Sequence, residues 1–80
     1  MRLDKFLKVS RLIKRRTVAN SASATGRVFV NGNSAKPGKQ LKVGDIIEIE
    51  YANHTEKVEV LIIPTGNVSV QDAGDLYRVI

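Results

Sequence analysis

The sequence contains no cysteine and no tryptophan, and none of its apolar runs approaches the roughly 18 residues of a membrane-spanning helix. These absences exclude a disulfide framework, and the sequence gives no indication of a secretory signal or a membrane span. A single histidine without cysteine partners does not make a metal site, so we expect no metal and no cofactor. Eighty residues can form one small core, which favours a single domain in a cytoplasmic protein.

Positive charge is concentrated at one end of the sequence. Residues 1–16 hold seven of the thirteen basic residues and one of the eight acidic residues, so this segment carries a formal charge of +6. The rest of the chain holds six basic and seven acidic residues, which leaves it at −1. A local field of one sign attracts a polyanion by charge neutralisation and counterion release. The asymmetry therefore predicts a nucleic-acid partner, with an ordinary solvated face as the rival interpretation.

This basic segment does not fit one continuous helix. At 100° per residue an apolar face forms from Leu3, Phe6 and Leu7, opposite the polar side chains Arg2, Asp4, Lys5 and Lys8. Without a break, Leu12 would lie on the polar side, so we expect a bend over residues 9–11 that returns Leu12 and Ile13 to the core.

A second helix is expected over residues 17–26, with Thr17 as its N-cap and Gly26 as its C-terminal stop. Its apolar side chains are small, which would let the two helices pack closely. They are Val18, Ala19 and Ala22.

After the helices the hydrophobic period changes to two residues. The segment 27–30 leads into Asn31-Gly32, the strongest short-range signal for a two-residue type I′ hairpin, and residues 33–35 would form the return strand. Residues 46–51 then alternate apolar and acidic side chains, as expected for a half-buried strand.

The C-terminal part continues the strand pattern. A partner strand is expected over 56–63, followed by a helical turn at about 70–74, where Ser69 and Asp72 have capping-box spacing, and by a last strand over 76–80. The side chains expected to point inward from the first of these strands are Val58, Val60 and Ile62. The elements together predict an α+β fold in which two short N-terminal helices pack on a small, mainly antiparallel β-sheet.

The chemistry of the basic side chains suits a folded phosphate backbone. Arginine can bridge phosphate oxygens with a planar fork, whereas lysine acts as a point charge. The segment mixes the two kinds: Arg2, Lys5, Lys8, Arg11, Lys14, Arg15 and Arg16. Because only four aromatic residues are available for stacking, recognition of RNA shape is favoured over reading of single-stranded bases.

Several motifs together resemble a known family. They are RLDKFL, a basic RR pair followed by a small-residue helix, GRVFVNG, a lysine shortly after it, and VGD before a strand. This combination resembles the S-four domain, the alpha-L RNA-binding motif named after a small-subunit ribosomal protein. The resemblance covers about residues 1–50 and leaves 51–80 as a β extension of a single domain, 1–80. Because the domain starts at Met1 and stands alone, the chain resembles the free-standing S-four proteins of ribosome-associated quality control, and more distantly the small heat-shock S-four protein.

The resemblance implies a non-catalytic, monomeric RNA-binding adaptor. Such a factor would bind the ribosomal RNA of a stalled large subunit that holds peptidyl-tRNA, and would help the partner factor RqcH to add alanines to the nascent chain. The residues that match the family's RNA-contacting motif are Arg2, Asp4, Lys5, Arg15, Arg16, Asn31 and Gly32, with Lys36 just beyond. Asp4 has two open roles: a first-turn acid that complements the helix dipole, or a group that orients an arginine.

Other functions remain as alternatives. The chain could recycle stalled large subunits as a heat-shock-type factor does, or assist ribosome assembly. The heat-shock relative typically carries a longer basic C-terminal extension, which favours the alanine-tailing role. An enzyme is less favoured, because the sequence offers no phosphate-cradling glycine loop and no nucleophile–base set. A membrane-surface module is disfavoured by the expected bend, which breaks the continuous apolar face that it would need.

Overall fold

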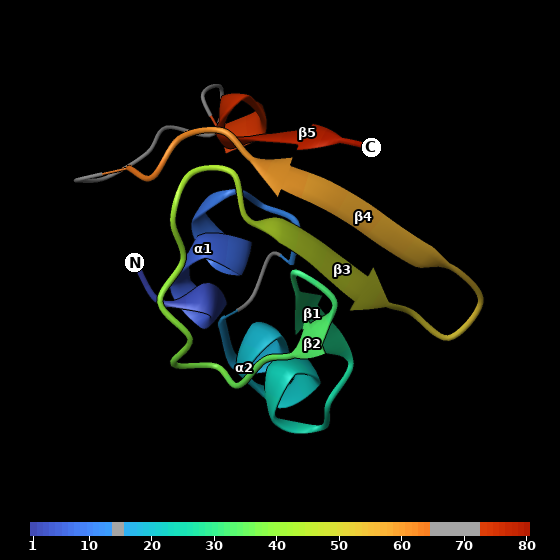
Figure 1. Cartoon of the computed structure of the whole chain (residues 1–80). Helices are drawn as coiled ribbons and strands as arrows, with labels where there is room; N and C mark the ends of the chain where they lie inside the picture. Colours follow the sequence, from blue (N-terminus) through green and yellow to red (C-terminus); the bar gives the residue numbers. More distant parts are fainter. Residues whose placement is uncertain (14–15, 65–72) are drawn as a thin grey trace.

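The first helix, α1, spans Leu3–Val9 and buries the apolar face that its sequence predicts. We describe residues 1–13, 16–64 and 73–80 of the chain from a computed structural model (Figure 1). In α1 the side chains of Leu3, Phe6 and Leu7 are fully buried. The predicted bend follows directly, since Ser10 caps the helix and Arg11 takes a left-handed backbone with φ of 62°. The amide of Ile13 then donates to the carbonyl of Leu7 at 3.0 Å, and Ile13 joins the core as expected.

The second helix, α2, spans Arg16–Ala24, and it corrects two expectations, one about its start and one about its buried face. Thr17 lies inside the helix and is not its N-cap. Val18 is 52% exposed, because the buried positions are Ala19 and Ser23, with the half-buried Ala22 between them. This stripe follows the i, i+3, i+4 spacing of a helix face, and a serine can belong to it because its hydroxyl donates to the carbonyl of Ala19 at 2.9 Å.

Gly26 ends α2 as predicted. Its φ of 80° lies in the left-handed region, where glycine has no side chain to strain. The amide of Gly26 donates to the carbonyl of Ser23, and the amide of Arg27 donates to that of Ala22, which is the hydrogen-bond pattern of a Schellman motif. The turn directs the chain straight into the first strand.

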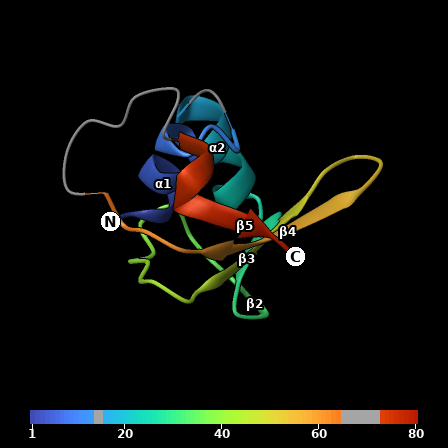
Figure 2. The same cartoon turned by 90° about the horizontal axis from the view of Figure 1, so that it is seen from above.

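The sheet has five strands in the order β2-β1-β3-β4-β5, and all neighbours are antiparallel. The strands are β1 Val28–Val30, β2 Asn33–Ser34, β3 Ile46–Glu50, β4 Thr55–Val60 and β5 Tyr77–Val79. Both helices lie on one side of this sheet, as the two perpendicular views show (Figures 1 and 2). The core forms between the two layers, where alternate strand residues meet the helices. The α+β architecture predicted from the sequence is therefore confirmed.

The Asn31-Gly32 turn joins β1 to β2 in the predicted way. Val30 pairs with Asn33 across a two-residue loop, and φ is positive at both loop residues, 53° at Asn31 and 85° at Gly32. Positive φ at both positions defines a type I′ turn, whose twist matches that of the flanking strands. The register predicted for this hairpin is confirmed.

Replacing Gly32 with valine should lower the free energy of unfolding by more than about 1 kcal/mol, because a β-branched residue is strained at positive φ. A side chain at Gly32 would meet no atom of the described residues within 4 Å, so the loss would come from the backbone alone. Urea denaturation would measure it. Gly74→Val is the matched control, because a side chain at Gly74 would likewise meet no atom of the described residues within 4 Å, but Gly74 does not have positive φ. If the Gly32 and Gly74 variants lost the same stability, the turn would not be under this constraint.

The structure of the C-terminal part corrects the expectation for one side chain that was predicted to point inward. Val58 and Val60 are fully buried as expected, but Ile62 is 49% exposed. The strand alternation ends at Val60, because the amides of Leu61 and Ile62 both donate to the carbonyl of Leu76. Ile63 packs against the core instead.

A 3-10 helix, η1, spans Ala73–Leu76 and leads directly into β5. The predicted last strand is thus confirmed over Tyr77–Val79, while Leu76 belongs to η1 and not to the strand. The helical turn expected at about 70–74 overlaps η1 at residues 73 and 74, while residues 70–72 lie outside the described part of the chain. The proposed capping pair, Ser69 and Asp72, is outside the described residues.

Candidate nucleic-acid interface

Arg2 stands at the N-terminal boundary of α1, where its extended backbone is bridged to Gln40. Its guanidinium donates to both carboxylate oxygens of Asp4, from Nε to Oδ1 at 3.2 Å and from Nη2 to Oδ2 at 3.4 Å. The side chain of Arg2 is 49% exposed and that of Asp4 only 2%. One edge of the guanidinium is therefore held by a buried acid, while the remainder of the side chain reaches solvent.

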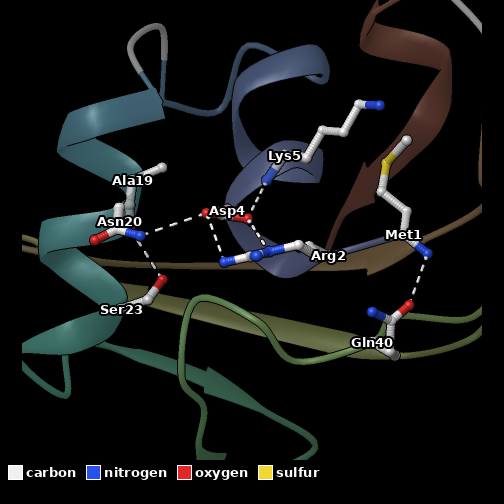
Figure 3. A network of polar contacts seen from close by, with 8 residues as sticks. All are labelled: Met1, Arg2, Asp4, Lys5, Ala19, Asn20, Ser23 and Gln40. Carbon is white, nitrogen blue, oxygen red and sulfur yellow. Dashed lines mark hydrogen bonds and ion pairs between the residues drawn. The ribbon is translucent and has the colours of Figure 1, made fainter.

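Asp4 is a buried junction between the two helices, which corrects its expected place on the polar face of α1. Besides Arg2, its carboxylate accepts hydrogen bonds from the backbone amide of Lys5 at 2.8 Å and from Nδ2 of Asn20 at 3.4 Å (Figure 3). Asn20 belongs to α2, so the acid is buried because α2 packs against α1 at this point. Both roles left open for Asp4 are compatible with this geometry, since it lies in the first turn and also orients an arginine.

The loop after β2 caps α1. The amide of Leu3 donates to the carbonyl of Lys39 at 2.8 Å, and the amide of Asp4 donates to the carbonyl of Pro37 at 3.1 Å. The loop turns at Pro37-Gly38, where a side chain at Gly38 would come within 3.9 Å of the Arg2 guanidinium. These contacts satisfy the free amides at the start of the helix with protein groups, so α1 presents its cationic side chains to a ligand and not its N-terminal amides.

The cations of α1 form a line on its exposed side. Arg2, Lys5 and Lys8 are spaced by three residues, which places them on one ridge of the helix, and Arg11 follows at the bend. Lys5, Lys8 and Arg11 are exposed, and none of these three forms an ion pair with another described residue. Figure 3 shows the ammonium of Lys5 pointing away from Asp4. Apart from Arg2, which is paired with Asp4, this ridge therefore carries positive charge that the described part of the fold does not neutralise.

Two cations on the sheet behave differently. Lys57 lies 4.0 Å from Glu48, its cross-strand neighbour, and Arg78 pairs with Glu59, its neighbour on the next strand. The register places these four residues on the side of the sheet that faces away from the helices. The sheet thus compensates these charges internally, in contrast to the α1 ridge.

The side chain of the turn residue Asn31 forms hydrogen bonds within the fold. Its side-chain amide donates to Oδ1 of the buried Asp45 at 3.1 Å, and its side-chain oxygen accepts the backbone amide of Ile46 at 2.9 Å. Gly32 beside it is exposed. Of the two predicted turn contacts, Gly32 can approach a ligand through its backbone, while the side chain of Asn31 mainly ties the hairpin to the start of β3.

The remaining predicted site residues are placed as follows. Lys36 is exposed in the loop that caps α1, and Arg16 is the first residue of α2. Lys14 and Arg15 lie outside the described residues. The sequence reasoning missed Lys39, which is also exposed in the capping loop. Its spacing of three from Lys36 across a Pro-Gly turn is the signal that could have identified it.

Tyr51 connects the far end of the sheet to the bend. Its hydroxyl donates to the carbonyl of Leu12 at 3.5 Å, and its ring stacks on His54 with centroids 4.7 Å apart. Burial, and then the negative charge of Glu56, raise the pKa of the Tyr51 hydroxyl. The hydroxyl therefore remains a hydrogen-bond donor throughout the neutral range.

The described residues hold no cluster of three or more His, Cys, Asp or Glu placed to bind a metal, and no helix among them is long and apolar enough to cross a membrane. What they do present is a small α+β fold of two packed helices, a capping loop and a tight hairpin, with a basic ridge on the exposed side of α1 where Lys5, Lys8 and Arg11 have no ion pair with a described residue. The chain belongs to the S4 (S-four) domain family, whose pattern matches residues 1–47. The resemblance drawn from the sequence is therefore confirmed.

Relatives match over the full chain. A Streptococcus pneumoniae protein named "RQC P-site tRNA stabilizing factor" is 48% identical, with 100% of this chain and 90% of that protein covered. A Bacillus subtilis protein of the same name is 40% identical, with 100% and 92% covered. Among solved structures, heat shock protein 15 of Vibrio cholerae, described as trimeric, superposes with a TM-score of 0.89 at 30% identity, covering 100% of this chain and 81% of that one.

Proposed function

We propose that this protein is a non-catalytic RNA-binding adaptor of ribosome-associated quality control. It binds a stalled large ribosomal subunit that carries peptidyl-tRNA, through ribosomal RNA and the tRNA, and supports alanine tailing of the nascent chain together with RqcH. It acts as a monomer in the cytoplasm. The proposal extends to this chain what the name of its relatives states, a factor of the RQC system that stabilises P-site tRNA.

The observation that carries this proposal is the contrast between the two groups of cations. Lys57 and Arg78 are paired with acids on the sheet. Lys5, Lys8 and Arg11, in contrast, form no ion pair within the part of the chain that the structure describes. Uncompensated charge of one sign lowers stability through self-repulsion, and a bound polyanion would neutralise it. A row of cations on one ridge fits a phosphate backbone, which carries one charge at every nucleotide.

The second candidate is the recycling of stalled large subunits by a heat-shock-type factor, with assistance of ribosome assembly as a further alternative. The structural likeness to heat shock protein 15 favours recycling as the second candidate. We rank it lower because sequence identity is 30% to that protein and 48% to the tRNA-stabilising relative.

The experiment that tests the proposal compares two forms of the large subunit. We would measure co-sedimentation of the purified protein with large subunits that carry peptidyl-tRNA in the P site, and with empty large subunits, over a series of potassium concentrations. An adaptor that also contacts the tRNA should bind the loaded subunit more tightly, and adding RqcH should support alanine addition only when the adaptor is present. Equal binding to both forms, with no effect on alanine addition, would favour the recycling or assembly functions.

A further inference from the structure

An open hollow of about 370 Å³ lies between the β1–β2 hairpin and the loop that caps α1. Its size falls in the range of small-ligand sites, roughly 300–1,000 Å³. The lining residues that bear on its chemistry are Val30, Asn33, Ser34, Ala35, Lys36 and Lys39. We propose that this hollow receives one unstacked nucleotide of the bound RNA, an inference that rests on the proposed RNA-binding function and names a subsite within it.

The floor of the hollow is apolar. Val30 and Ala35 are 4% and 6% exposed, and both belong to the core that forms against the helices. Val30 also pairs with Asn33 across the hairpin, so their side chains share the helix-facing side of the sheet. An apolar floor beside polar side chains suits the face of a nucleobase. It offers contact with a base without an aromatic platform, and so differs from the recognition by RNA shape that the small number of aromatic residues favours.

The rim supplies a backbone donor and a backbone acceptor. β2 is an edge strand whose one neighbour in the described sheet is β1. Because the amide of Ala35 donates to the carbonyl of Val28, the next pair along the ladder, Phe29 with Ser34, is a non-hydrogen-bonded pair. The amide and carbonyl of Ser34 therefore point away from β1, toward the free edge. Every nucleobase presents both donors and acceptors on its pairing edge, so an unpaired base can match such an edge.

Two lysines that line the hollow can bind the phosphate of the nucleotide. Lys36 and Lys39 are exposed, and neither forms an ion pair with any residue of the described segments. The same loop is bonded to the start of α1 through the carbonyl of Lys39 and lies against the Arg2 guanidinium at Gly38. The basic ridge of α1 thus continues over the loop to the hollow. A strand that follows the ridge can place its next phosphate at the lysines and the attached base against the floor.

The test is a titration of the full-length, nitrogen-15-labelled protein followed by NMR. The probes are UMP and AMP, the corresponding nucleosides, and inorganic phosphate, each up to about 20 mM, which detects dissociation constants in the millimolar range. We expect nucleotides and nucleosides to shift the amide signals of Val30 and of residues 33–36, with the nucleotides bound about tenfold more tightly through the phosphate. Shifts from phosphate that match those from the nucleotides, with none from the nucleosides, would overturn the proposal in favour of a plain anion site. The absence of any shift at these residues would also overturn it.

A variant pair separates base from phosphate. The double substitution Lys36→Ala/Lys39→Ala should abolish the tenfold advantage of nucleotide over nucleoside and leave nucleoside binding unchanged. Lys42→Ala, which removes an exposed lysine that does not line the hollow, should alter neither. If nucleoside binding vanished in the double variant, while its spectrum showed an intact fold, the base would not occupy the apolar floor.

The same samples distinguish failure of this inference from failure of the proposed function. Binding to large subunits would be measured beside each titration. Subunit binding that persists while mononucleotides produce no shift would remove the nucleotide subsite and leave the adaptor function standing. Loss of both would remove the proposed function itself.

Discussion

An Asp4→Asn protein should lose about 1.5–3 kcal/mol of its free energy of unfolding, the range expected for buried hydrogen bonds to a charged group. Asn keeps the size of Asp but carries no charge, and its NH₂ group cannot accept the hydrogen bond that Arg2 donates. The carboxylate is 2% exposed, so solvent does not replace the lost bonds. Urea denaturation of both proteins would measure the difference.

The size of this loss discriminates between the two roles of Asp4. An effect on the helix dipole alone would cost about 0.3–1 kcal/mol, because α1 would lose one first-turn charge. A larger loss would mean that Asp4 stabilises the protein mainly through its contacts with Arg2 and Asn20. Asp75→Asn is the matched control, since Asp75 is also a first-turn acid, in η1, but is exposed, and its replacement should cost no more than about 0.5 kcal/mol. Equal losses at the two positions would contradict a structural role for the buried network.

Removing three cations from the α1 ridge should have the largest effect on binding. The triple substitution Lys5→Ala/Lys8→Ala/Arg11→Ala should weaken binding to large subunits about a hundredfold at moderate salt and reduce the slope of log affinity against log salt by roughly two to three. The fold should be retained, because these exposed side chains have no ion pair with a described residue to lose. Co-sedimentation over a potassium series would give both the affinity and the slope.

The control for this variant removes the same amount of charge elsewhere. Lys42→Ala/Lys57→Ala/Arg78→Ala gives the protein the same net charge, but two of its three cations are paired with acids on the sheet. Its slope should stay close to that of the unmodified protein. If the two triple variants weakened binding equally, total charge and not the α1 ridge would determine the affinity, and the proposed interface would be wrong.

Features that depend on neighbours in the chain were predictable from the sequence. The bend follows from Leu12, which cannot lie on the apolar face of one continuous helix with Leu3. The type I′ turn follows from Asn31-Gly32, because these two residue types tolerate positive φ. The excess of positive charge at the N-terminal end can be counted directly from the sequence. In each case the deciding energy is local: a backbone preference, a helical period, or the charge of a short segment.

Features that depend on contacts between distant segments were decided by the tertiary structure. Helical period alone placed Asp4 among the solvated residues, and it is buried because Asn20 of α2 packs over it. Strand alternation alone placed Ile62 inward, and it is exposed because hydrogen bonds to Leu76 end the alternation of β4.

The arrangement of the candidate interface has the same origin. The hollow exists because the loop that follows β2 is bonded to α1 through Leu3 and Asp4, more than thirty positions earlier in the chain. A periodic pattern reports which side of one element is apolar, but not which other element covers it. The sequence by itself therefore determined the elements and the sign and position of the charge, whereas packing decided which cations are held by acids, which have no ion pair with a described residue, and where the hollow forms.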